Sequence, residues 1–366
     1  MLPPGYKESN TESIAIDTAR ATSALWVGIG VGTTFAVTVL LLGLDLLTRQ
    51  MWMDEVHTWL IVTDPDIGHA MTALSRGADY NPPTYYLLLR LFTSITAATP
   101  QAMRTFSLLA MACGLGCVGA LLRRRFSTLA AICGCATIGM QPLIIQQATE
   151  ARFYSAWFAL VAMFCLARSH CTVVERGEAN LRGGSRLVQL LVQSALAAMI
   201  CTVHYFGVIS LGLVFLVDAL NEIRVPAVSA ANLSASSKSG VKHRARLVLW
   251  CVPYAAGVLA VAGCIGFYLG QRSSLTVATW ISPPTIAKVK MFALEFLPVI
   301  PIGLAALGWV LSGGLEEHAS QTPQTAGEAR ADDRQLSLLI AGLGMPVILI
   351  LFSYTCLLYT SPSPRD

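Results

Sequence analysis

Long apolar stretches are the feature of this sequence that most restricts its fold. A helix needs roughly 20 apolar residues to cross a bilayer, and in lipid it satisfies its own backbone hydrogen bonds. Nine stretches meet this description: 24–47, 105–122, 127–148, 153–169, 187–203, 206–221, 247–269, 291–312 and 336–356. Only 13% of the residues are charged, whereas a soluble domain has about 25%. The sequence therefore predicts an all-α polytopic membrane protein with about nine spans.

The stretch 84–98 decides the topology. It is short, carries Arg90 and follows Asn-Pro-Pro. If it lies at the membrane surface and the N-terminus is inside, the loops rich in Arg and Lys all fall on the inner side. The first outer loop, 48–104, then holds five acids and four bases. If 84–98 crosses, three later basic loops turn outward, so we expect an interfacial helix.

This topology divides the chain into five parts. They are a cytoplasmic tail at 1–23, a membrane module at 24–221 that includes the outer loop 48–104, a cytoplasmic loop at 222–246, further spans at 247–356, and a tail at 357–366. The last part resembles translated adapter read-through, so we expect a non-native tail and a truncated C-terminus. The net charge of +4 is too small and scattered to predict a nucleic-acid partner.

The adjacent acids Asp54 and Glu55 are the main candidates for chemistry. A carboxylate in the membrane is costly, and these two follow the first apolar stretch directly. They either face water at the start of a loop, or one is a general base while the other positions a ligand or metal. We expect an extended loop here, with the two side chains pointing in opposite directions. His57 lies at a spacing that matches no strong metal-ligand pattern.

Other polar segments reach the same outer boundary. Pro82 and Pro83 predict a helix beginning at Thr84, with Tyr85 and Tyr86 either anchoring it in the lipid interface or, with Asn81, lining a polar pocket. Arg152 is a membrane anchor, a partner of Glu150, or a clamp for a lipid phosphate. Arg104 and His204 are further candidates, and His204 is equally compatible with a simple break between helices.

The order of these motifs resembles that of the GT-C membrane glycosyltransferases, in the protein-mannosyltransferase-like and rhizobial-type set. The acidic pair is similar to their first outer-loop motif, "NPPTYYLLLR" to their x-P-P-x-Y-Y segment, "QATEARFY" to their E-A-R-x-Y stretch and "VHYFG" to a later H-Y-F step. The basic-ended span "RTFSLLAMACGLGCVGALLRRRF" fits the same order. The resemblance covers about 24–221. Asn81 departs from it, because many relatives have His or another base there.

The resemblance implies an inverting transfer of a sugar from a polyprenyl-phosphate-linked donor to a lipid, glycan or protein acceptor. It also implies that this reaction takes place on the extracytoplasmic face of a bacterial-type plasma membrane. Asp54 would be the general base, Glu55 would help hold the site, and Arg152 would neutralise the leaving phosphate. The substrate-binding set is Arg152, Tyr154, Glu150, Asn81, Tyr85, Arg104 and His204. No cofactor is certain, and a divalent metal stays open. The alternatives are a transporter or flippase of a lipid-linked substrate, and a non-catalytic protein that binds lipid phosphate.

Overall fold

The computed structural model describes residues 6–124, 126–174, 183–224 and 238–275, and within these ranges it contains helices and no strand. The predicted spans 291–312 and 336–356 and the predicted tail 357–366 lie outside the described residues. The helices are α1 (Tyr6–Leu42), α2 (Leu44–Thr48), α3 (Met53–Thr63), α4 (Ile67–Ser75), α5 (Thr84–Ile95), α6 (Pro100–Arg123), α7 (Thr128–Gly139), α8 (Pro142–Ala148), α9 (Tyr154–Val174), α10 (Gly183–Val203), α11 (Gly207–Arg224), α13 (Lys238–Gly263) and α14 (Ile265–Leu275).

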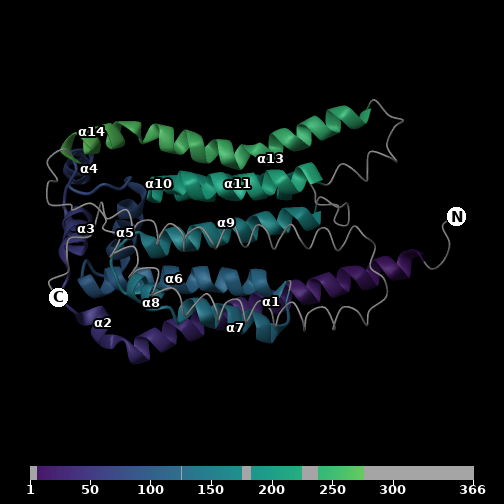
Figure 1. Cartoon of the computed structure of the whole chain (residues 1–366), viewed down its shortest axis with the longest axis horizontal. Helices are drawn as coiled ribbons and strands as arrows, with labels where there is room; N and C mark the ends of the chain where they lie inside the picture. Colours follow the sequence, from purple (N-terminus) through teal and green to yellow (C-terminus); the bar gives the residue numbers. More distant parts are fainter. Residues whose placement is uncertain (1–5, 125, 175–182, 225–237, 276–366) are drawn as a thin grey trace, which may run out of the picture.

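The longer helices run side by side as a bundle (Figure 1). Three of them are long and apolar enough to cross a membrane, at Ala21–Leu42, Pro100–Arg123 and Arg186–Val203. Two bent pairs, α7 with α8 and the apolar part of α13 with α14, raise the number to five if each pair is one span. Over the described ranges the chain is thus all-helical, and its apolar helices are compatible with a multi-pass membrane protein.

Two predicted spans differ in detail from the observed helices. The predicted span 127–148 is not one straight helix, because the chain bends by 74° between α7 and α8 at Pro142, and the bent pair is still compatible with a single span. Proline has no N–H to donate and cannot continue a helix without a break. The first stretch also ends earlier than expected, since α1 stops at Leu42 and the short α2 follows Gly43.

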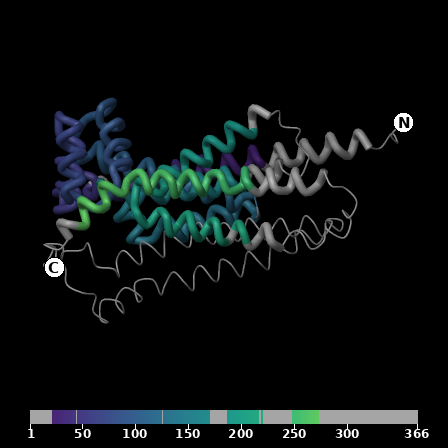
Figure 2. The backbone as a smooth tube through the Cα atoms, turned by 90° about the horizontal axis from the view of Figure 1, so that it is seen from above, coloured from purple at the N-terminus to yellow at the C-terminus, as the bar shows by residue number. Residues whose placement is uncertain are grey.

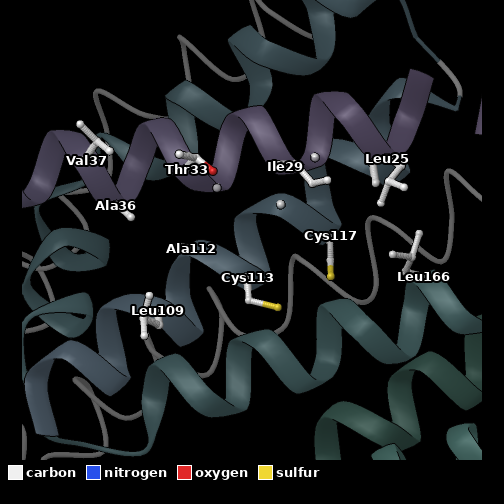
Figure 3. A pocket seen from close by; sticks show the side chains of 14 residues that line it. Leu25, Ile29, Thr33, Ala36, Val37, Leu109, Ala112, Cys113, Cys117 and Leu166 are labelled. Carbon is white, nitrogen blue, oxygen red and sulfur yellow. The ribbon is translucent and has the colours of Figure 1, made fainter. Parts of the chain in front are cut away.

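Small residues bring α1 and α6 into close contact. A Cβ atom on Gly28 would lie 2.5 Å from the carbonyl oxygen of Gly116, and one on Gly32 would lie 2.5 Å from that of Ala112. Such spacing of small residues lets two helix backbones approach in a membrane. Beside the crossing lies an apolar groove of about 550 Å³ lined by α1, α6 and Leu166 of α9 (Figure 3).

Three short helices, α3, α4 and α5, lie across one end of the bundle at a steep angle to the long helices (Figure 2). Helix α14 reaches the same end and packs against α4 (Figure 1). Helix α5 begins at Thr84, as predicted, and its 12 residues rise only about 18 Å, too little to cross a bilayer. Its exposed side chains Leu87, Leu91 and Ile95 recur every four residues and form one apolar stripe.

One prediction about the outer loop is wrong, and one of the two alternatives left open for Tyr85 and Tyr86 does not fit the structure. Asp54 and Glu55 lie in the first turn of α3 rather than on an extended loop, so their side chains are about 100° apart around a helix. Tyr85 and Tyr86 are buried in the core instead of anchoring α5 in the lipid interface. Tyr85 packs against Phe106 and Phe153.

Candidate functional site

Glu55 forms a closed ion pair with Arg104 at the start of α3, and both side chains are 0% exposed. Arg104 donates from Nε to Oε1 at 2.9 Å and from Nη2 to Oε2 at 2.7 Å. Glu55 also accepts from the backbone N–H of Ala151 at 2.8 Å and caps α3 through the N–H of Trp52 at 3.4 Å. The remaining N–H groups of Arg104 donate to the carbonyl oxygens of Leu47, Arg49 and Gln50. This pair joins α3, α6 and the segment before α9.

Arg152 lies between two other carboxylates. Its Nη1 is 2.7 Å from Oδ2 of Asp79, and its Nη2 is 3.5 Å from Oδ2 of Asp54. Arg152 is 4% exposed and Asp79 is also buried, whereas the Asp54 side chain is 24% exposed. Arg152 therefore holds Asp79 tightly and Asp54 loosely, and Asp54 is the more accessible of the two acids.

Asp79 is held from both sides. Its Oδ1 accepts from the backbone N–H of Tyr80 at 2.7 Å and from Nδ2 of Asn81 at 3.0 Å, while Oδ2 faces Arg152. Burial alone would raise the pKa of Asp79, but the charge of Arg152 and hydrogen bonds from Tyr86, the Tyr80 N–H and Arg152 outweigh it, so the pKa is lowered. Asp79 is thus a fixed counter-charge, and Asn81 orients it.

Asp54 has the opposite electrostatic environment. Burial raises its pKa above the ordinary value for aspartate, Arg152 lowers it in part, and the nearby charge of Asp79 raises it further. A carboxylate with a raised pKa and an open edge is suited to act as a general base.

Glu150 pairs with Arg49 at 3.2 Å and accepts from Nε2 of Gln146 at 2.9 Å. One interpretation of Arg152 made it the ion-pair partner of Glu150. The structure instead pairs Glu150 with Arg49 and Arg152 with Asp79 and Asp54. The four carboxyl groups Asp54, Glu55, Asp79 and Glu150 meet three guanidinium groups, those of Arg49, Arg104 and Arg152. This leaves one carboxylate without a cation of its own, and the longest contact belongs to Asp54.

His204 belongs to an aromatic wall next to Arg152. Its ring stacks on Phe153 with a centroid distance of 4.3 Å, and Trp157 lies 5.3 Å away. Burial and the positive charge of Arg152 lower the pKa of His204 to about 3, so the ring is neutral. Its Nδ1 accepts from the backbone N–H of Phe206 at 3.2 Å, which assigns the ring proton to Nε2. His204 thus serves as a neutral packing group in this arrangement.

The structure brings every predicted site residue to the same end of the bundle. Tyr154 is half-buried and packs on Phe153, with ring centroids 4.1 Å apart. The sequence analysis did not identify Asp79 as the partner of Arg152 or Arg49 as the partner of Glu150. Asp79 belongs to the polar segment before Pro82. An acid in such a segment near the membrane boundary is a signal that could have suggested an arginine partner. Among the described residues no group of three or more His, Cys, Asp or Glu side chains could hold a metal ion.

A second ionic cluster lies deeper in the bundle and was also missed. Arg168 of α9 pairs with Asp218 of α11, and Oδ2 of Asp218 also accepts from Nε1 of Trp250 at 2.8 Å and from the hydroxyl of Tyr254 at 3.0 Å. From Tyr154 to Arg168 helix α9 rises about 21 Å. Asp218 is the only acid in the apolar stretch 206–221, and this isolated charge was the sequence feature that could have indicated a buried ion pair.

Comparison of the chain with protein-family models, with curated proteins and with solved structures gave no match.

Proposed function

We propose that this protein is an integral membrane glycosyltransferase that moves a sugar from a polyprenyl-phosphate-linked donor to an acceptor, with inversion at the anomeric carbon. The observation that carries the proposal is the contrast between Asp54 and the other three acids. Glu55, Asp79 and Glu150 each have a close cationic partner, whereas Asp54 has an open edge, a long contact to Arg152 and a raised pKa. These are the properties that a general base needs.

In the proposed reaction Asp54 accepts the proton of the acceptor hydroxyl as the acceptor oxygen bonds to the anomeric carbon. The bond from that carbon to the phosphate oxygen breaks, and polyprenyl phosphate leaves with the electron pair. Arg152 exchanges its 3.5 Å contact with Asp54 for the phosphate while it keeps Asp79. The donor's phosphate thus frees the base at the moment that it brings the leaving group into the site.

The short helices α3, α4 and α5 at the end of the bundle suit a substrate that enters from the lipid bilayer. The apolar stripe of Leu87, Leu91 and Ile95 on α5 is matched to the surface of a bilayer. In the full proposal α5 is an interfacial helix on the extracytoplasmic face, above a GT-C-like bundle of about nine spans. In this arrangement the acidic cluster of Asp54 and Asp79 would face the phosphate of a lipid-linked donor.

A transporter or flippase of a lipid-linked substrate is the second candidate. The observation that favours it is the ion pair of Arg168 and Asp218 inside the bundle, because ionisable groups within a membrane often belong to a transport path. Against it, the cluster shares its hydrogen bonds among side chains of four helices, as a structural ion pair does. A non-catalytic protein that binds lipid phosphate would use Arg152 but would not need Asp54.

The test is transfer of a radiolabelled sugar from a panel of polyprenyl-phosphate donors in proteoliposomes. We expect Asp54→Asn to lower transfer by about 10²- to 10⁴-fold, the usual contribution of a general base. Asp66→Asn is the matched control, because Asp66 is exposed and asparagine also caps a helix. Transfer by Asp54→Asn at the wild-type rate would overturn the proposal. Binding without transfer would identify the non-catalytic protein, and movement of intact donor across the bilayer would identify the flippase.

A further inference from the structure

Gln271 connects three segments at the end of the bundle that carries the site. Helix α14 follows α13 after a bend of 45° and places Gln271 against the segment between α4 and α5. The Nε2 of Gln271 donates to the carbonyl oxygens of Leu74 at 3.1 Å and Asn81 at 3.0 Å. Its Oε1 accepts from the hydroxyl of Tyr205 at 2.9 Å. Gln271 is 1% exposed, so these bonds form out of contact with water.

The two carbonyl groups bracket the segment that carries Asp79. Leu74 is in the last turn of α4, and Asn81 comes directly before the two prolines that start α5. One amide group therefore fixes both ends of the segment 74–81. Since Tyr205 is the neighbour of His204, the same amide also ties this segment to the turn between α10 and α11.

The backbone next to Gln271 fits the segment just as closely. A Cβ atom on Gly270 would lie 2.2 Å from the carbonyl oxygen of Ser75. Only glycine permits this approach, and the approach is what brings the amide of Gln271 within reach of Leu74 and Asn81. Glutamine suits the place because two carbonyl oxygens need two donated hydrogens and the tyrosine hydroxyl needs one acceptor.

We propose that Gln271 is a positioning residue, which sets the place of Asp79 and through it the orientation of Arg152 toward Asp54. The inference rests on the proposed function for its effect on transfer. Gln271 touches neither Asp79 nor Arg152. It acts by holding the backbone of Asn81, whose side chain donates to Asp79 at 3.0 Å. If Asp79 moves, Arg152 is no longer held in the place from which it would exchange its contact with Asp54 for a phosphate.

The first experiment measures transfer by Gln271→Glu, which keeps the shape of the side chain and removes both donated hydrogens. We expect kcat to fall about tenfold with KM for the acceptor little changed, because the catalytic groups are misplaced rather than lost. The ratio of the variant's kcat to that of the wild type should rise as pH falls, since a protonated glutamic acid regains one donor. Arg272→Gln is the control, because Arg272 is exposed, adjacent and gives the same change in net charge.

The second experiment does not depend on activity. Arg76 is exposed and lies within the segment 74–81, so limited digestion with trypsin reports how firmly the segment is held. We expect cleavage after Arg76 to be about tenfold faster in Gln271→Glu and unchanged in Arg272→Gln. Wild-type cleavage in Gln271→Glu would overturn the inference, whether or not the protein transfers sugar. Faster cleavage together with wild-type transfer would also overturn it, and absence of transfer by the wild type would count against the proposed function alone.

Discussion

The two ionic clusters described in this protein both consist of arginine and carboxylate side chains, but they differ in the ratio of positive to negative groups. In the deeper cluster one arginine, Arg168, meets one carboxylate, Asp218, and Trp250 and Tyr254 add hydrogen bonds to the same oxygen. At the end of the bundle four carboxyl groups share three arginines, and Asp54 is left with a contact of 3.5 Å and an open edge.

This difference in charge ratio suits the deeper cluster to a structural role and the cluster around Asp54 to a chemical one. A balanced, enclosed pair has no group left to bind a substrate, and removing one partner mainly costs stability. A cluster with an excess carboxylate keeps one group poorly neutralised, and a substrate that brings its own charge can change which partner Arg152 holds. The same contrast occurs within α3, where Glu55 is closed and its neighbour Asp54 is open.

The largest effect on stability is expected for Glu55→Gln. This change leaves the guanidinium of Arg104 fully buried without a counter-charge, which costs about 3–5 kcal/mol in the free energy of unfolding. Thermal unfolding of the purified protein in nanodiscs measures it, with Asp66→Asn as the control. A loss of stability no greater than that of the control would show that the pair does not hold α3 to α6.

A smaller loss is expected for Asp218→Asn. Polar contacts inside a membrane contribute only about 1–2 kcal/mol, because the unfolded helices in lipid also find partners. The same unfolding measurement applies, and sugar transfer at the wild-type rate is expected alongside it. Loss of transfer without loss of stability would show that the deeper cluster takes part in the reaction rather than only in the stability of the fold.

The pH dependence of transfer tests the open acid directly. Because burial raises the pKa of Asp54, the base becomes protonated at a higher pH than an ordinary aspartate. Below that pKa the rate of transfer should fall about tenfold per pH unit, since only the ionised form accepts a proton. A rate that stays constant down to the pKa of an exposed aspartate would contradict the assignment of Asp54 as base.

The smallest effect is expected for the stability of Asp54→Asn, less than about 1 kcal/mol, because Asp54 is partly exposed and Arg152 keeps Asp79. A raised pKa stabilises the fold at low pH, and this contribution is lost as pH rises through the raised value. The variant should therefore gain stability relative to the wild type as pH increases. Unfolding midpoints at several pH values measure this, and the opposite trend would mean that Asp54 is held as tightly as Glu55.

Much of the fold could be predicted because it depends on local composition. Long apolar stretches become helices wherever lipid or a protein core surrounds them, and the start of α5 at Thr84 follows from the two prolines before it. The bend between α7 and α8 and the helical state of Asp54 were harder to predict. The bend occurs at Pro142, and the helix that contains Asp54 is capped by Glu55, which accepts from the N–H of Trp52.

The sequence by itself determined that the chain is helical and apolar, and it identified the residues that carry charge near the ends of the apolar stretches. Only the tertiary structure decided which charges are paired. Asp54 and Glu55 are adjacent in sequence, yet one turn of α3 directs Glu55 to Arg104, 49 residues away, and Asp54 toward Arg152, 98 residues away. The strength of an ion pair depends on distance and burial in three dimensions, and neither can be read from the order of residues.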